Sequence, residues 1–225
     1  MVMPLESNPA VPSVAELIEA VQRADSALGL LQATQALAAV ADPQAASTLV
    51  EILGFNNPGA AVAAVDGLIA IGQPAVDTIL LNIDGYNYGA RAWAVRALAG
   101  IGDVRGLDVL EDALGKDIGP SVRRAAARGL GQLKFQQLAP EQRDPVALRC
   151  LQALLEGCRD GEWVVRYSVV VGLESLASVL VQLGEEPVHR LRSALQQLRL
   201  DPEEEAPVVQ LRAALALERL GGGDA

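Results

Sequence analysis

The sequence predicts an all-α protein that folds as an α-solenoid, a superhelix of about six short helical repeats. Three observations favour this fold class. The chain is 51% hydrophobic but only 3% aromatic, which suits helices packed on helices better than sandwiches or barrels. A small residue followed by leucine recurs along the whole chain. Glycine, aspartate and proline stand between the recurrences, where helices begin and end.

The repeat is defined by one small residue in each of six segments. These residues are Ala36, Gly67, Ala97, Gly129, Gly172 and Ala216, separated by 31, 30, 32, 43 and 44 positions. Each unit is long enough for two helices, and such a pair cannot bury its apolar face without stacking on its neighbours. The pattern is therefore that of HEAT-like repeats.

Capping signals support the helix boundaries in chain order. Ser13 and Glu16 have the spacing of a capping box for the first helix. Asp42 precedes a first-turn proline, as a helix start requires. In the third unit, residues 89–102 form an amphipathic pattern that ends at Gly102-Asp103. The acidic stretch 201–207 places carboxylates at the positive end of the last helix.

The domain organisation follows from this pattern. We expect a flexible N-terminal segment at 1–12, one solenoid domain at 13–220 and a flexible tail at 221–225. Residues 134–145 and 182–188 are expected to be loops within the array.

Composition excludes several function classes. A net charge of −10 disfavours nucleic acid and anionic membrane surfaces, and favours a cationic partner protein. The chain does not start with basic residues followed by an apolar segment, so no signal peptide is expected. No uncharged apolar run reaches the roughly 18 residues needed to span a membrane. We expect a soluble, cytoplasmic protein. Cys150 and Cys158 lack zinc-ligand spacing and are expected to be free thiols, and a single histidine, His189, excludes a histidine dyad; no metal site is expected.

Arginines recur at one position of the repeat. Arg91, Arg123 and Arg166 each stand six residues before the small residue of the third, fourth and fifth units. Two interpretations are open. The arginines can pair with acidic residues of neighbouring repeats as a structural ladder, or they can face an anionic ligand, which suits their bidentate geometry.

The aromatic residues cluster in a way that the repeat does not require. Tyr86, Tyr88 and Trp93, three of only seven aromatics, fall within eight positions, together with Arg91 and Arg96. Each can be an ordinary packing residue, but the cluster favours stacking on a flat ligand or anchoring a partner. A second group, Trp163 and Tyr167 around Arg166, lies two repeats later, with Arg123, Arg124 and Arg128 between the groups. Together they predict a groove with aromatic walls and a cationic middle, fit for a flat, elongated dianion.

The segments 85–114, "GYNYGARAWAVRALAGIGDVRGLDVLEDAL", and 120–135, "PSVRRAAARGLGQLKF", resemble the F subunit of the E/F-type phycobilin lyases. The resemblance covers most of residues 50–220. It implies a cyanobacterial cytoplasmic protein that works as a heterodimer with an E subunit. It also implies attachment of phycocyanobilin, through a thioether, to a cysteine of the phycocyanin α subunit. The bilin is the transferred substrate, so no cofactor is expected.

The resemblance assigns roles to the clustered residues. Asp84, Tyr86 and Tyr88 are the candidates for contact with pyrrole nitrogens or for proton donation. The expected bilin-binding residues are Tyr86, Tyr88, Arg91, Trp93, Arg96, Arg123, Arg124, Trp163, Arg166 and Tyr167. Two alternatives remain: a non-catalytic HEAT-like scaffold or chaperone for phycobilisome proteins, and a lyase for a related pair such as phycoerythrobilin on phycoerythrin. An isomerising lyase is not expected, because no cysteine stands directly after the single histidine, His189.

Overall fold

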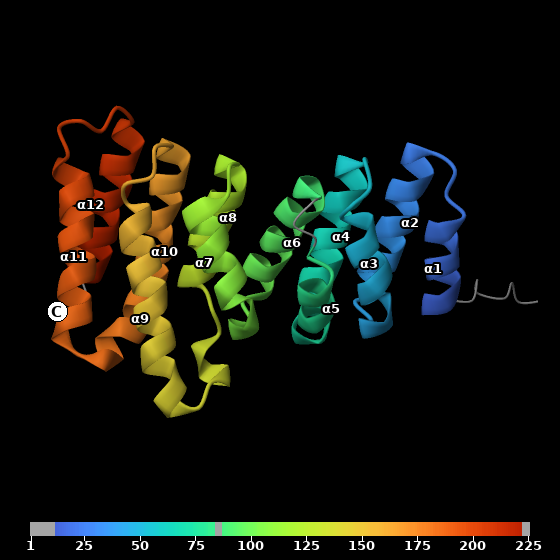
Figure 1. Ribbon diagram of the computed structural model, residues 1–225, viewed down its shortest axis with the longest axis horizontal. Helices are drawn as coiled ribbons and strands as arrows, with labels where there is room; N and C mark the ends of the chain where they lie inside the picture. Colours follow the sequence, from blue (N-terminus) through green and yellow to red (C-terminus); the bar gives the residue numbers. More distant parts are fainter. Residues whose placement is uncertain (1–11, 84–86, 222–225) are drawn as a thin grey trace, which may run out of the picture.

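The computed structural model describes residues 12–83 and 87–221. Within these ranges the chain forms twelve α-helices in six pairs, and no strand (Figure 1). The first helices of the pairs are α1 (Val14–Gln22), α3 (Ala46–Ile52), α5 (Val76–Leu81), α7 (Leu107–Lys116), α9 (Pro140–Gly157) and α11 (Glu185–Leu200). The second helices are α2 (Ala27–Ala39), α4 (Pro58–Ile71), α6 (Tyr88–Ile101), α8 (Pro120–Gly131), α10 (Trp163–Leu183) and α12 (Pro207–Gly221).

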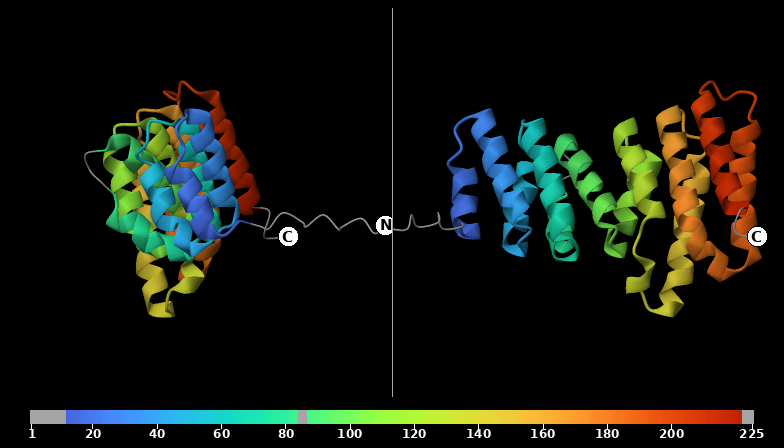
Figure 2. Two further views of the ribbon diagram at one scale, coloured as in Figure 1. Left: turned by 90° about the vertical axis from the view of Figure 1, so that its right-hand side faces the viewer. Right: turned by 180° about the vertical axis from the view of Figure 1, so that it is seen from behind.

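The pairs follow one another along the long axis of the molecule, with α1 and α12 at opposite ends (Figures 1 and 2). Each second helix packs on the second helix of the next pair, from α2 through to α12. These six helices form the even layer, and the first helices form the odd layer. The core is the row of buried leucine, isoleucine, valine and alanine side chains between the layers. The predicted solenoid of six repeats is confirmed.

The small residues of the repeat explain how the even layer packs. A Cβ atom added to Gly67 would lie 2.7 Å from the Cβ of Ala38 on α2. On α8, a Cβ added to Gly129 would lie 2.7 Å from the Cβ of Ala99 on α6. Between α8 and α10 the contact is tighter, because a Cβ at Gly172 would lie 2.4 Å from the carbonyl oxygen of Ala127. Backbones approach closely at these positions, and a larger side chain would push the helices apart.

The capping predictions hold at the helix starts. Ser13 and Glu16 form the expected reciprocal capping box. Asp42 and Asp103 each accept a backbone hydrogen bond at the start of a short 3₁₀ turn that precedes the next helix. Asn87 accepts from the amide of Ala90 at 3.0 Å and so begins α6, one residue before the predicted start.

The internal loops predicted at 134–145 and 182–188 were wrong in extent. Helix α9 begins at Pro140 and continues through Pro145, and a 3₁₀ turn spans Phe135–Gln137, so most of residues 134–145 is helical. Only Gly184, with φ of 114°, separates α10 from α11. Pro187 lies in the first turn of α11, where a backbone amide has no helical partner and proline is tolerated. The predicted flexible segments at 1–12 and 221–225 lie outside the described residues, except for Pro12 and for Gly221, which ends α12.

Helix α10 is long and apolar enough to cross a membrane by length and composition. Half of that stretch is buried in the fold, and the helix packs between α8 and α12. Its two charged residues, Arg166 and Glu174, are both ion-paired. Helix α4 and the segment that follows it pass the same test only together, and they bend by 116° where they meet. The apolar character of α10 is accounted for by its central place in the even layer.

Candidate functional site

Three arginines near the starts of α6, α8 and α10 reach acidic residues of the following repeat. Arg123 donates from Nε and Nη2 to the two carboxylate oxygens of Asp160, at 2.7 and 2.9 Å. Arg166 binds Glu204 in the same way, at 2.7 and 2.6 Å. Each guanidinium also donates to a backbone carbonyl in the loop of its own repeat. These are bidentate, charge-assisted pairs.

Arg91 completes the series with a looser geometry. Its Nη2 donates to Asp112 at 2.8 Å, and its Nε lies 3.5 Å from Asp117. The acidic partners at the three loops are almost fully enclosed, with side chains of Asp117, Asp160 and Glu204 exposed by 3%, 9% and 1%. We call Arg91, Arg123, Arg166 and these partners the arginine ladder. This arrangement is the structural alternative that the sequence left open, and a ligand-binding role for these three arginines stays a prediction.

The ladder shifts the ionisation of its carboxylates. The hydrogen bond from Arg166 holds the pKa of Glu204 below its usual value. Burial alone would raise the pKa of Asp160, but hydrogen bonds from Arg123 and from the backbone amide of Glu162 lower it overall. Both carboxylates are therefore stabilised in their charged form, as a structural ion pair requires.

Tyr88 lies at the ladder. Its hydroxyl donates to Oδ1 of Asp117 at 3.2 Å, while the residue as a whole is 43% exposed. Burial of the hydroxyl and the nearby charge of Asp117 raise the pKa of Tyr88. The other two residues predicted to act with it, Asp84 and Tyr86, lie outside the described residues.

Trp93 and Arg96 point to a different surface, the outer face of the even layer. Arg96 lies over the Trp93 ring, 4.6 Å from its centroid, a cation–π contact. Trp93 is half-buried and packs against the core. The positions equivalent to Trp93 on α4, α8 and α10 are Ala63, Ala125 and Ser168, and each of these residues lines a hollow in the surface. The tryptophan therefore fills a position that is open in the neighbouring units.

Two hollows lie next to each other on this outer face. One, of about 300 Å³, lies between α6 and α8 and is lined by Arg96, Gly100, Ala125 and further small or polar residues. The other, of about 340 Å³, lies between α8 and α10 and is lined by Trp163, Tyr167 and Val208 among others. Arg124 and Arg128 line both hollows, so the pair forms one surface divided by α8. We call these two hollows together the face groove.

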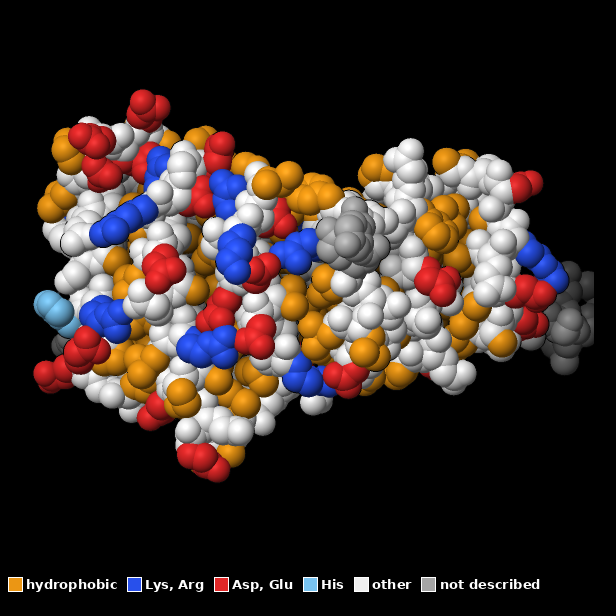
Figure 3. Space-filling model, viewed as in Figure 1, with side chains coloured by type: hydrophobic (Ala, Val, Ile, Leu, Met, Phe, Trp, Pro, Cys, Tyr) orange, Lys and Arg blue, Asp and Glu red, His pale blue; other side chains and the backbone are white. Residues whose placement is uncertain are grey.

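The cations of the face groove differ from those of the ladder. Within residues 12–83 and 87–221, Arg96, Arg124 and Arg128 form no ion pair, and Arg124 and Arg128 are exposed. Elsewhere, Arg and Lys side chains lie beside acidic ones over the C-terminal half (Figure 3). Arg128 was not among the expected binding residues. Its spacing of four from Arg124, which puts both on one helix face, was the signal for it.

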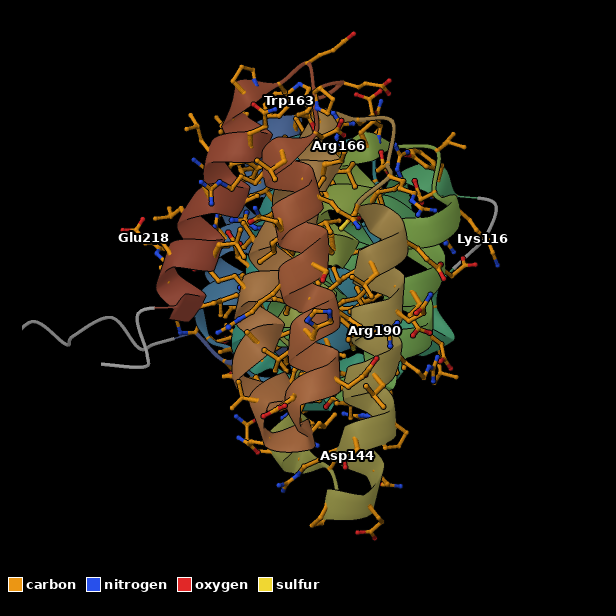
Figure 4. The ribbon with its side chains drawn as sticks, turned by 90° about the vertical axis from the view of Figure 1, so that its left-hand side faces the viewer. Lys116, Asp144, Trp163, Arg166, Arg190 and Glu218 are labelled. Atoms are coloured by element: carbon orange, nitrogen blue, oxygen red, sulfur yellow. The ribbon has the colours of Figure 1, made fainter. Side chains whose placement is uncertain are left out.

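The structure thus separates the predicted groove into two parts. Trp163, Tyr167, Arg124 and Arg96 line the face groove, and Trp93 supports it from α6. Arg91, Arg123 and Arg166 lie in the ladder instead. Figure 4 shows Trp163 and Arg166 near the same edge of the solenoid, at the top of the view and at the start of α10, although they serve different surfaces.

A third hollow on the same face has the opposite charge. It measures about 410 Å³, lies between α2 and α4, and is lined mainly by small residues and Val62, with the exposed carboxylate of Asp66. No arginine or lysine lines it. Its volume suits a small ligand, but its charge does not suit an anion.

The cysteines and the histidine lie away from the face groove. Burial raises the pKa of Cys150 and of Cys158 to about 12, so neither thiol is activated as a nucleophile. Both are free thiols, as predicted. Cys158 and His189 line a cleft of about 750 Å³ beside α9 and α11, together with Arg159, Arg190 and Asp201. Among the described residues no group of three or more His, Cys, Asp or Glu is placed to hold a metal ion.

Comparison with known proteins places these observations in context. A family model described as HEAT repeats matches residues 80–174. The phycocyanin alpha phycocyanobilin lyase CpcF of Synechocystis sp. is 48% identical over 218 residues, which cover 96% of this chain and 99% of that protein. A phycobilisome maturation protein of Synechococcus elongatus is 47% identical over 92% of this chain and 98% of its own length.

A solved structure is similar as well. In the complex of CpcE and CpcF of phycocyanin lyase from Nostoc sp. PCC7120, one chain superposes with a TM-score of 0.67 at 41% identity. The match covers 78% of this chain and 99% of that one.

Proposed function

The chain belongs to the family of F subunits of the E/F-type phycobilin lyases, and from this premise we propose that it attaches phycocyanobilin to a cysteine of the phycocyanin α subunit. The acceptor thiol adds across the ethylidene group of bilin ring A and forms a thioether. The proton of the thiol is transferred to the bilin, so the addition is balanced without an oxidant or a reductant. The bilin is the substrate, and the reaction needs no resident cofactor or metal.

The observation that carries this proposal is the match between the face groove and a bilin. A linear tetrapyrrole is flat and elongated and carries two propionates. The face groove offers Trp163 and Tyr167 for stacking and Arg124 and Arg128 for carboxylates. Because these arginines form no ion pair within the described part of the chain, they have no acidic side chain to displace when an anion binds.

The chain's own residues position the bilin rather than attack it. The nucleophile comes from the acceptor protein, which agrees with the raised pKa of both thiols in this chain. Holding the bilin in one conformation and orientation lowers the entropic cost of the addition. Tyr88, Tyr86 and Asp84 stay the candidates for proton transfer; the hydroxyl proton of Tyr88 is directed to Asp117, so Tyr88 would have to release that bond before donating to the bilin.

We also propose an E-type subunit as the obligate partner. The final helix, α12, exposes Val208, Leu211 and Leu215 at spacings that place them on one side of the helix. An apolar stripe at the end of a solenoid is a surface that a partner helix can cover. We expect the chain alone to be poorly behaved in solution, and a monodisperse monomer in sizing experiments would contradict this expectation.

The test is co-expression of this chain with an E-type subunit, a phycocyanobilin supply and the phycocyanin α subunit. We expect a covalent chromophore on the acceptor, measured by zinc-enhanced fluorescence of the denatured protein and by mass spectrometry. A lyase pair of known activity is run in parallel. If that pair succeeds and this one yields acceptor without chromophore, the lyase function is wrong and the scaffold or chaperone alternative takes its place. Supplying phycoerythrobilin with phycoerythrin in a parallel culture tests the related-substrate alternative.

A further inference from the structure

The two hollows of the face groove meet at one pair of residues, and this gives the groove a centre. Arg124 and Arg128 lie one helical turn apart on α8, and both line the hollow on each side of that helix. Residues four apart on a helix have Cβ atoms about 5–6 Å apart. The groove therefore has a cationic ridge in the middle and two separate ends.

The two ends differ in shape and chemistry. The hollow between α8 and α10 is walled by Trp163 and Tyr167, and the hollow between α6 and α8 by small residues such as Gly100 and Gly129. Their volumes, about 340 and 300 Å³, lie at the lower limit for ligand pockets. An elongated ligand thus has to extend across α8 to use both.

A linear tetrapyrrole has the matching arrangement of charge. Its two propionates extend from the two middle rings, and the outer rings carry none. We propose that Arg124 and Arg128 bind the two propionates, so that the middle rings lie over α8 and the outer rings occupy the two hollows. This inference rests on the function proposed above, and it names the residues that recognise the carboxylates of the substrate.

Other surfaces with cations or suitable volume fit less well. The hollow between α2 and α4 is larger but carries Asp66 and no cation. The cleft beside α9 and α11 contains Arg159 and Arg190, but Arg190 already donates to Gln152 and lies 3.8 Å from Glu186. No phenylalanine, tyrosine or tryptophan among the described residues lines that cleft. The ladder arginines are held by their carboxylates. Among these surfaces, the face groove alone combines arginines that form no ion pair in the described part of the chain with walls of tryptophan and tyrosine.

The test compares phycocyanobilin with its dimethyl ester, in which both propionates are neutral. The two forms are titrated into the complex with the E-type subunit, and binding is followed by visible absorbance. We expect the wild-type complex to bind the free acid roughly tenfold or more tightly than the ester, because charge-assisted pairs are lost in the ester. In the double variant Arg124→Gln, Arg128→Gln we expect this preference to disappear, with ester binding unchanged.

Two single variants serve as controls. Arg159→Gln removes an exposed cation on the other cleft and should leave the preference intact. Trp163→Ala should weaken binding of acid and ester alike, because stacking does not depend on the propionates. The proposal is overturned if the wild-type complex binds the free acid and the ester equally, and this measurement does not depend on whether a variant folds. It is also overturned if the double variant keeps the full preference for the free acid.

The outcomes separate this proposal from the proposed function. Wild-type complex that prefers the free acid but attaches no bilin to the acceptor would contradict the lyase function alone. Normal attachment and an unchanged KM for bilin in the double variant would contradict the propionate assignment and leave the lyase function standing.

Discussion

The arginine ladder and the face groove both use arginines of helices α6 and α8, but for different roles: the ladder arginines form ion pairs between repeats, and the groove arginines stay unpaired in the part of the chain that the structure describes. In the ladder, Arg123 binds Asp160 through two hydrogen bonds and is 16% exposed. In the face groove, the adjacent Arg124 is exposed and forms no ion pair within the described residues. The side chains of consecutive residues leave a helix about 100° apart, so one reaches the next repeat and the other faces solvent. The comparison teaches that a helix start can be fixed in place by one arginine while its neighbour stays available to a ligand.

The largest effect is expected from breaking the ladder at its most enclosed pair. Arg166→Ala leaves the carboxylate of Glu204, which is 1% exposed, without its partner. Removing one member of a buried ion pair costs about 3–5 kcal/mol, and we expect the lower part of that range because Arg166 is 17% exposed. Urea denaturation measures the loss. The double variant Arg166→Ala, Glu204→Ala is the control and should recover part of it; no recovery would show that the pair is not the source of the stability.

A second prediction concerns Gly172, the glycine at which α10 packs closely on α8. Gly172 lies where α10 contacts α8, and an added Cβ would lie 2.4 Å from the carbonyl oxygen of Ala127. Gly172→Ala should destabilise the protein by about 1–3 kcal/mol, as overpacking does. It should also widen the hollow between α8 and α10 and weaken bilin binding. Gly115→Ala, at a helical glycine with open space around it, is the matched control and should not destabilise. Equal thermal midpoints for both variants would contradict the close packing described above.

The ladder also predicts how stability depends on pH. The folded-state pKa of Glu204 and of Asp160 is lowered, so each contributes stability that is fully present above the unfolded pKa of about 4. That contribution is lost as pH falls through the lower, folded values. Acid titration followed by circular dichroism should show the loss beginning below about pH 4. The variant Glu204→Gln should flatten this part of the curve, and an unchanged slope would argue that other carboxylates dominate.

The smallest effect is expected at the free thiols. Cys158→Ser changes a residue that lies outside the face groove and whose raised pKa keeps it protonated. Attachment of bilin should continue at the wild-type rate, measured as chromophore per acceptor over time. A loss of attachment without a loss of stability would mean that this thiol takes part in the transfer.

The fold was predictable because its repeat is a packing requirement. The small residue followed by leucine marks where successive helices of the even layer touch, as Gly67 and Gly129 show. The two internal loops predicted at 134–145 and 182–188 were wrong in extent, because the prolines in these stretches are accommodated by helices α9 and α11. In α11, Pro187 stands in the first turn, where it breaks no hydrogen bond.

The candidate site was only partly predictable. Sequence identified the aromatic and cationic clusters and left a structural ladder open for Arg123, but both Arg123 and Arg124 were expected to bind the bilin. Their difference depends on Asp160, 37 residues away, which reaches one guanidinium and not the other. Arg128 was noted in the cationic middle of the predicted groove, but it was not named among the expected binding residues. Its spacing of four from Arg124 is the signal in the sequence, and the structure adds that both arginines line the two hollows.

The division between ladder and face groove is tested most directly by two variants of adjacent residues, Arg123→Gln and Arg124→Gln. For each, the free energy of unfolding and the affinity of the folded complex for phycocyanobilin are measured side by side. We predict that Arg123→Gln lowers stability and leaves the affinity of the folded complex unchanged. We predict the reverse for Arg124→Gln, with stability kept and affinity reduced. If Arg123→Gln weakens bilin binding while stability is kept, or if Arg124→Gln destabilises the fold, the two rows of arginines do not divide these roles.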